Sequence, residues 1–169
     1  MSKTIQDNDY PVTIGSKKAM VSRRCFIVYI NRKHEFHARI VAQLQVVGYV
    51  AHELILPPEE SGKCSIESDI KAKMVGLDLI VVYLSTDVSA NACMGVLTKE
   101  AEKRGIRLVA LWLDDAVAKS FPAPIDSLGD AVTPYTDNLA DVFSGKENPW
   151  LLPDGHELPK RKIKKHTCG

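Results

Sequence analysis

Residues 79–100 read LIVVYLSTDVSANACMGVLTKE, an apolar run that passes into small polar residues and then into a helical pattern. A continuous apolar run of this length is typical of a strand covered on both faces of a parallel sheet. Residues 88–104 have helical spacing and are followed by Gly105, a residue that suits the end of a helix. The stretch therefore predicts a buried strand and a helix joined by a short polar loop.

The same alternation extends along the chain in both directions. Strands that alternate with helices at this spacing predict a parallel sheet with helices on both faces, because right-handed crossovers place them there. Gly48 is expected to end the first helix and Ser65 to cap the start of the second. The expected strands are 25–30, 50–56, 79–84, 106–113 and a short edge strand within 130–135, and the expected helices are 36–47, 66–75, 88–104 and 137–143.

The ends of the chain differ in composition from its middle. Residues 1–22 are polar with scattered apolar side chains and predict an N-terminal arm, whereas residues 23–144 form the α/β domain. Residues 145–169 predict an extended tail rich in proline and lysine. In this tail, Trp150 and the leucines after it are expected to anchor the segment on the domain.

The charge is unevenly distributed. The chain has 22 basic and 21 acidic residues, but five of the basic ones lie in the last ten residues, which contain no acid. The 17 basic residues that remain face 21 acidic ones, so residues 1–159 carry a net charge of −4. A general nucleic-acid binder needs a basic face, and only the tail offers one. The tail is interpreted as a solvated terminus, with an acidic protein or a nucleic acid as alternative partners.

The cysteines are at positions 25, 64, 93 and 168 and form no close pair. This spacing predicts neither a disulfide framework nor a zinc site, and Cys93 is expected to be a small buried apolar residue. The first residues lack the apolar core of a signal peptide, and the apolar run 79–84, which no other run exceeds in length, is too short to span a membrane. We expect a cytoplasmic protein with reduced thiols, no membrane contact and no bound metal.

Three polar loops are expected to converge at one edge of the sheet. In open parallel sheets, ligands bind at the carboxyl ends of the strands, where helix N-termini favour anions. The loops 30–35, 57–65 and 85–91 lie there and predict a pocket for a phosphorylated nucleotide, although the hydroxyl groups also suit helix caps. No GxGxxG, Walker or GxSxG motif is present. The candidate ligand-binding residues are Asn31, Arg32, Lys33, Ser85, Thr86, Asp87 and Asn91.

Two long stretches are CFIVYINRKHEFHARIVAQLQVVGY (25–49) and IESDIKAKMVGLDLIVVYLSTDVSANACMGVLTKEAEKRG (66–105). In the order of their elements and residues they resemble the TIR-like domains of Toll and interleukin-1 receptors and of bacterial immune systems. The likeness extends over residues 24–143. It implies a flavodoxin-like three-layer α/β sandwich, with a central parallel sheet of four to five strands and helices on both faces.

The resemblance also implies a function. Such domains handle NAD or a nucleotide-derived signal, here in a prokaryotic antiviral defence system, with NAD or an ADP-ribose derivative as substrate or ligand and no other cofactor required. They commonly associate with themselves or with partner proteins through the loop after the second strand, here 57–65.

Whether the chain is an enzyme depends on one carboxylate. Enzymatic TIR-like domains break the nicotinamide glycosidic bond with a glutamate of the third helix, because a carboxylate stabilises an oxocarbenium-like centre. The family spacing, counted from Ser85 or back from Gly105, places Leu97 at that position. Glu100, three residues further on, is the candidate catalytic residue, and a solvated surface glutamate is its competing interpretation. The alternatives are a non-catalytic nucleotide-binding or self-assembling signalling module, and a nucleoside deoxyribosyltransferase-like enzyme.

Overall fold

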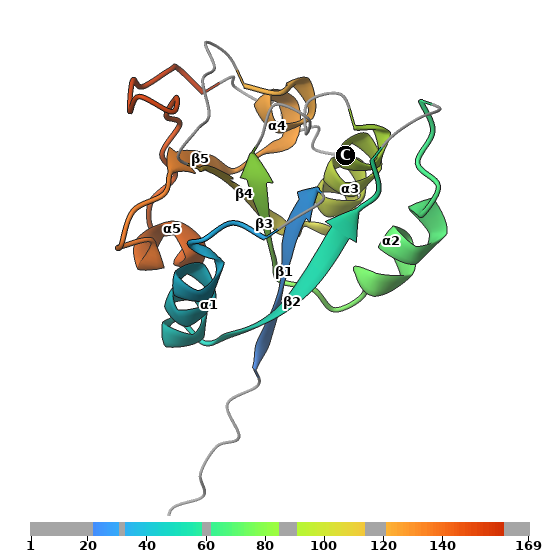
Figure 1. The fold of residues 1–169 in the computed structure, drawn as a ribbon, viewed down its shortest axis with the longest axis horizontal. Helices are drawn as coiled ribbons and strands as arrows, with labels where there is room; N and C mark the ends of the chain where they lie inside the picture. The colour runs from blue at the N-terminus through green and yellow to red at the C-terminus, as the bar shows by residue number, and fades with distance from the viewer. Residues whose placement is uncertain (1–21, 31–32, 59–61, 85–90, 114–120, 161–169) are drawn as a thin grey trace, which may run out of the picture.

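The sheet has five parallel strands in the order β2-β1-β3-β4-β5. The computed structural model describes residues 22–30, 33–58, 62–84, 91–113 and 121–160 (Figure 1). This strand order is that of flavodoxin-like folds, so the expected α/β sandwich is confirmed. The strands are β1 Arg23–Ile30, β2 Tyr49–Leu56, β3 Leu79–Leu84, β4 Arg107–Trp112 and β5 Ala131–Pro134.

Five helices within the described residues cover the two faces of the sheet (Figure 1). Side chains of α1 and α5 pack into the core on one face, and side chains of α2, α3 and α4 pack into the core on the other. No helix within the described ranges is long and apolar enough to cross a bilayer. The helices are α1 His37–Val46, α2 Glu67–Lys73, α3 Ala92–Arg104, α4 Ala123–Leu128 and α5 Ala140–Ser144.

Alternation along the strands divides the core into two halves. In β1, Phe26 and Val28 point toward α2 and α3, whereas Ile27 and Tyr29 point toward α1. All six residues of β3 are buried, as the continuous apolar run predicted. The central strands therefore hold both helical layers, and their carboxyl ends lead into the predicted ligand loops.

The ends of the helices follow the sequence signals in part. Gly105 adopts the left-handed conformation, with φ 65°, and caps α3 by donating its N–H to the carbonyl groups of Ala101 and Glu102. Gly48 also has positive φ, 87°, directly after the first helix. The predicted N-cap at Ser65 is wrong, because Ile66 occupies that position and makes no side-chain cap. The expected start of α3 at residue 88 is wrong as well.

The correct start of α3 is set by Asn91. Its backbone is extended, with φ −82° and ψ 118°, and the helix begins at Ala92. The helix α4 has no counterpart among the predicted elements, since its six residues are too short to show helical periodicity.

The beginning of the C-terminal tail is anchored on the domain, as predicted. Trp150 is 3% exposed and Leu152 7%. Backbone hydrogen bonds of 2.8 Å join Val132 to Pro149 and to Leu151, and the Trp112 indole donates to the Leu151 carbonyl. The basic residues after Lys160 and the predicted arm before Ser22 lie outside the described residues.

Candidate functional site

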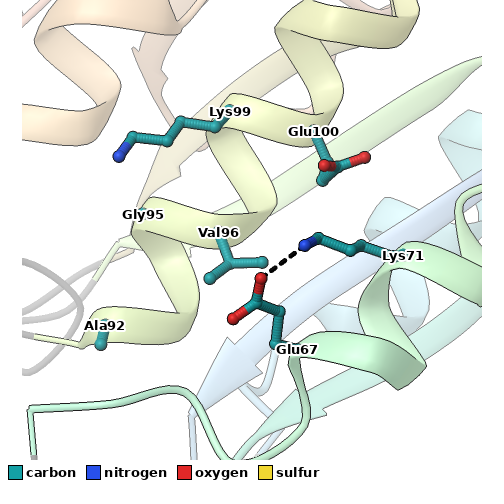
Figure 2. A pocket seen from close by; sticks show the side chains of 7 residues that line it. All are labelled: Glu67, Lys71, Ala92, Gly95, Val96, Lys99 and Glu100. Atoms are coloured by element: carbon teal, nitrogen blue, oxygen red, sulfur yellow. Dashed lines mark hydrogen bonds and ion pairs between the residues drawn. The ribbon is translucent and has the colours of Figure 1, made fainter.

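A groove of about 360 Å³ lies between α2 and α3 (Figure 2). This volume is at the lower end of the range of small-molecule sites, about 300–1,000 Å³, and suits a ligand of mononucleotide size. Gly95 contributes no side chain, and a Cβ atom there would have nothing within 4 Å, so the wall of α3 is open at this point. The lining residues are Glu67, Lys71, Ala92, Gly95, Val96, Lys99 and Glu100.

Helical periodicity explains why these side chains meet. Ile70 and Met74 fix α2 on the core, and Met94, Leu97 and Ala101 do the same for α3. The groove residues of α3 are spaced by three or four positions, so they form a neighbouring stripe on the same helix. The groove is therefore bordered by two helices whose buried faces hold them in place.

The groove carries charges of both signs. Lys71 forms an ion pair with Glu67, one helical turn away, and this contact raises the pKa of Lys71. Lys99 is exposed on the opposite wall and, among the described residues, makes no ion pair. One ammonium group of the groove is thus paired with a carboxylate, whereas that of Lys99 forms no ion pair within the described residues.

Glu100 is largely buried and is not a solvated surface residue. The residue is 9% exposed and lines the groove. Its Oε2 accepts a hydrogen bond of 3.2 Å from Nε of Arg104, whose Nη2 donates to the carbonyl of Lys71 at 3.2 Å. Arg104 thereby connects the carboxylate to α2. The competing interpretation of a solvated glutamate is wrong, because α2 covers this side of α3.

Leu97 does not face the groove. Its side chain is fully buried in the core between the sheet and the helices. The position that the family spacing assigns to the catalytic glutamate is therefore part of the core here, and Glu100 is the acidic side chain that α3 contributes to the groove.

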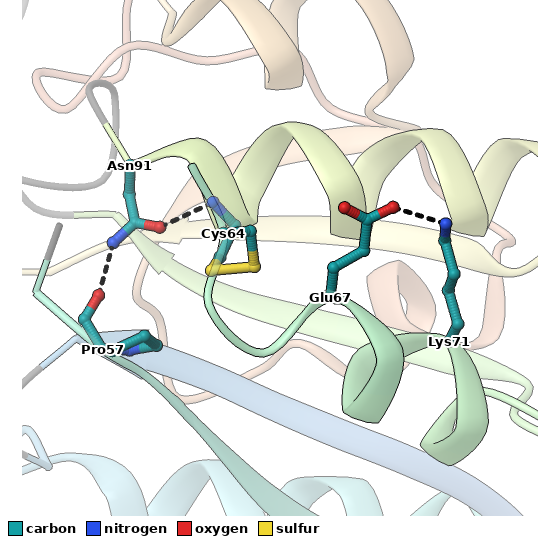
Figure 3. Close-up of a disulfide and its surroundings, with 6 residues drawn as sticks. Pro57, Cys64, Glu67, Lys71 and Asn91 are labelled. Atoms are coloured by element: carbon teal, nitrogen blue, oxygen red, sulfur yellow. Dashed lines mark hydrogen bonds and ion pairs between the residues drawn. A yellow bond between two sulfur atoms is a disulfide. The ribbon is translucent and has the colours of Figure 1, made fainter. Parts of the chain in front are cut away.

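Asn91 serves as a helix cap and joins two segments. Its Oδ1 accepts the N–H of Cys93 at 2.9 Å, and its Nδ2 donates to the carbonyl of Pro57 at 2.9 Å (Figure 3). Asn91 is 5% exposed, so both contacts are made in a buried setting. Asn91, predicted as a ligand-binding residue, thus caps α3 in the structure.

A disulfide joins Cys64 to Cys93 next to this cap (Figure 3). The expectation of reduced thiols is therefore wrong for these two cysteines. Cys93 is buried, as expected, but it lies in the first turn of α3 and is covalently bonded. Because 29 positions separate the pair along the chain, no spacing motif indicated it.

Lys33 belongs to a different cluster, on the α1 face of the sheet. It pairs with Glu53, which also accepts from the Tyr29 hydroxyl at 2.8 Å and lies 3.1 Å from Nε2 of His37. The Nδ1 atom of His37 is 2.9 Å from the Tyr83 hydroxyl. The structure therefore does not bring Lys33 together with Glu100.

Contacts and burial within this cluster shift the pKa values of its members. Lys33 lowers the pKa of Glu53, and burial together with the Glu53 carboxylate raises the pKa of Tyr29 to about 12. Sequence reasoning missed Tyr29, Glu53 and Tyr83 as members of a polar site. A glutamate within the apolar run YVAHELIL was the available signal.

The other candidate residues are not covered by the structure. Asn31, Arg32, Ser85, Thr86 and Asp87 lie outside the described residues. Within the described ranges, no group of three histidine, cysteine or acidic side chains is placed to hold a metal ion.

The comparisons with known proteins do not identify a ligand for the groove. No family model matches the chain, and a search of curated proteins finds no match either. The TIR-like resemblance stays a prediction from the sequence.

Proposed function

We propose that the chain is a TIR-like module that binds NAD or an ADP-ribose derivative in the groove between α2 and α3, and that Glu100 contacts the ribose. The observation that carries this proposal is Glu100, whose side chain is 12% exposed and lines the groove from the third helix. Ligand pockets usually contain a few placed polar or charged side chains that orient the ligand.

The groove residues suit the parts of a nucleotide. Lys99 supplies a positive charge for a phosphate group, with Lys71 on the facing wall. Gly95 leaves room for a sugar or a base close to the helix backbone. Glu100 accepts hydrogen bonds from ribose hydroxyl groups. The volume of about 360 Å³ accommodates one mononucleotide half of NAD, so the second half extends out of the groove.

Glycosidic cleavage is the reaction for which this carboxylate is suited. As the bond between C1′ and the nicotinamide nitrogen breaks, the nitrogen keeps the electron pair and positive charge grows on the ribose. The Glu100 carboxylate stabilises that charge. Water then adds to C1′ and releases a proton. Arg104 holds the carboxylate in position from outside the groove.

The biological setting follows from the resemblance alone. We place the protein in the cytoplasm, in a prokaryotic antiviral signalling system, and assign self-association or partner binding to residues 57–65. One observation favours a module that binds a nucleotide without turning it over. Pro57 and Cys64, on the two sides of the undescribed residues 59–61, are both held against the start of α3, by Asn91 and by Cys93, and they are the described residues of the proposed assembly loop.

Incubation of the full-length protein with NAD, followed by chromatography for nicotinamide and ADP-ribose products, tests the proposal. Release that is lost in Glu100→Gln and retained in the matched control Glu102→Gln supports catalysis. Glu102 is an exposed residue of the same helix that does not line the groove. No release, with a thermal shift on adding NAD that Lys99→Ala removes, indicates a binding module. Absence of both effects rejects the proposal, and base release from deoxynucleosides indicates the deoxyribosyltransferase-like alternative.

A further inference from the structure

The segment before α2 is attached to the first turn of α3 at two points. The carbonyl of Pro57 accepts a hydrogen bond from Asn91, and Cys64 is bonded to Cys93, with their Cα atoms 4.6 Å apart. Both attachments end within residues 91–93, one on Asn91, the cap of α3, and the other on Cys93 in its first turn (Figure 3). Pro57 and Cys64 are thus held against the start of α3 by one hydrogen bond and one reversible covalent bond.

The attachments lie directly beside the groove. Ala92, between Asn91 and Cys93, lines it, and so does Glu67, three residues after Cys64. Cys64 packs against the same core half as Ile70 of α2, so the bond fixes the start of α2 relative to α3. Each bonded cysteine is therefore no more than three positions along the chain from a residue that lines the groove, so breaking the disulfide affects both walls.

The rest of the described chain offers no thiol that can exchange with this disulfide. Cys25 is fully buried on the opposite face of the sheet, and burial raises the pKa of its thiol. Cys64 is partly exposed, whereas Cys93 is 2% exposed. Cys64 is therefore the more accessible of the two bonded cysteines to an external thiolate.

We propose that the Cys64–Cys93 disulfide is a redox latch of the groove. In the oxidised form the bond holds the α2 and α3 walls in the geometry that binds the nucleotide, and reduction by a dithiol loosens them. This inference rests on the proposed function for the identity of the ligand. It agrees with the proposed cytoplasmic location, since disulfides in reducing compartments are mostly transient, catalytic or redox-sensing.

The reaction is an ordinary thiol–disulfide exchange. A thiolate of the dithiol attacks Sγ of Cys64, the bond to Cys93 breaks, and Cys93 leaves as a thiolate and takes up a proton. The second thiol of the reductant then attacks the mixed disulfide and releases Cys64 as a thiol. The products are two protein thiols and one oxidised reductant.

Hydrogen exchange and NAD binding, measured on the full-length protein before and after reduction with dithiothreitol, test the latch. Peptide mapping without reduction first checks the link between Cys64 and Cys93. We expect reduction to accelerate exchange several-fold at residues 62–66 and 91–96, and to weaken NAD binding about tenfold because the site is no longer pre-organised. The variant Cys64→Ser should match the reduced protein and ignore dithiothreitol. The control Cys25→Ala should keep the response.

Each other outcome separates the latch from the proposed function. The latch is overturned if Cys64 and Cys93 are not linked in the oxidised protein. It is also overturned if reduction leaves the hydrogen-exchange rates at residues 62–66 and 91–96 unchanged. If reduction accelerates hydrogen exchange but the oxidised and reduced proteins bind NAD with equal affinity, the disulfide does not regulate ligand binding in the groove. Faster exchange in a protein that binds no NAD in either form rejects the proposed function and supports the latch, because the exchange measurement needs no ligand.

Discussion

The Nε atom of Arg104 lies 3.2 Å from Oε2 of Glu100, one helical turn earlier on α3. The same guanidinium donates to the carbonyl of Lys71 on α2, so it connects the carboxylate of one groove wall to the backbone of the other. With Glu100 9% exposed, this arrangement limits the rotation of the carboxylate. Arg104 is thus a positioning residue for Glu100 in the proposed reaction.

Replacement of Arg104 tests that role. Arg104→Met should lower kcat for NAD cleavage about tenfold with a smaller change in KM, because the carboxylate loses its orientation but the lysines remain. The free energy of unfolding should fall by only about 1 kcal/mol, since the ion pair is partly exposed. Steady-state kinetics and urea unfolding measure the two effects. Lys103→Met is the matched control, and an equal loss of kcat in that variant contradicts the positioning role.

Replacement of Asn91 separates its two contacts. Asn91→Ala removes both the cap of α3 and the contact with Pro57, and should lower the free energy of unfolding by about 1–2 kcal/mol. Asn91→Ser keeps a hydroxyl oxygen that caps the helix but lacks the amide donor, so it should recover most of this loss. Urea unfolding of the oxidised protein checks both values. Equal losses in the two variants would show that the Pro57 contact, and not the cap, carries the stability.

The cluster around Glu53 predicts a dependence of stability on acidic pH. Because Lys33 lowers its pKa, Glu53 stabilises the folded state above the unfolded-state value of about 4.3, and this contribution is lost as the pH falls through the folded-state pKa. Glu53→Gln should therefore make the free energy of unfolding less sensitive to pH between about pH 5 and pH 3. Unfolding curves across this range, with Glu102→Gln as control, measure the slope. The idea fails if Glu53→Gln and the wild type have the same slope.

The sheet was predictable because its signals are local. The apolar runs at 25–30 and 79–84 mark strands covered on both faces, and both are strands in the structure. Gly48 and Gly105 mark the ends of helices because each adopts positive φ there, which other residues rarely do. These features depend on a few consecutive residues, so the sequence specifies them directly.

The groove and the Glu53 cluster were harder to predict because their parts meet only after folding. The disulfide joins residues 29 positions apart, and the contact between Tyr29 and Glu53 depends on the register of β1 with β2. Glu100 reads as part of a charged run, and its burial follows only from the packing of α2 against α3. Sequence reasoning found the candidate carboxylate but not the neighbours that bury and orient it.

Leu97 provides the sharpest test of how the groove relates to the family spacing. Leu97→Glu should lower the free energy of unfolding by roughly 3–5 kcal/mol, because the side chain is fully buried in the core and a carboxylate there has no partner. Leu97→Met, which conserves volume, should cost less than about 1.5 kcal/mol. Urea unfolding distinguishes the two. A stable Leu97→Glu protein that gains NAD cleavage would mean that position 97 can reach the ligand, and it would transfer the catalytic role from Glu100 to the position that the spacing assigns.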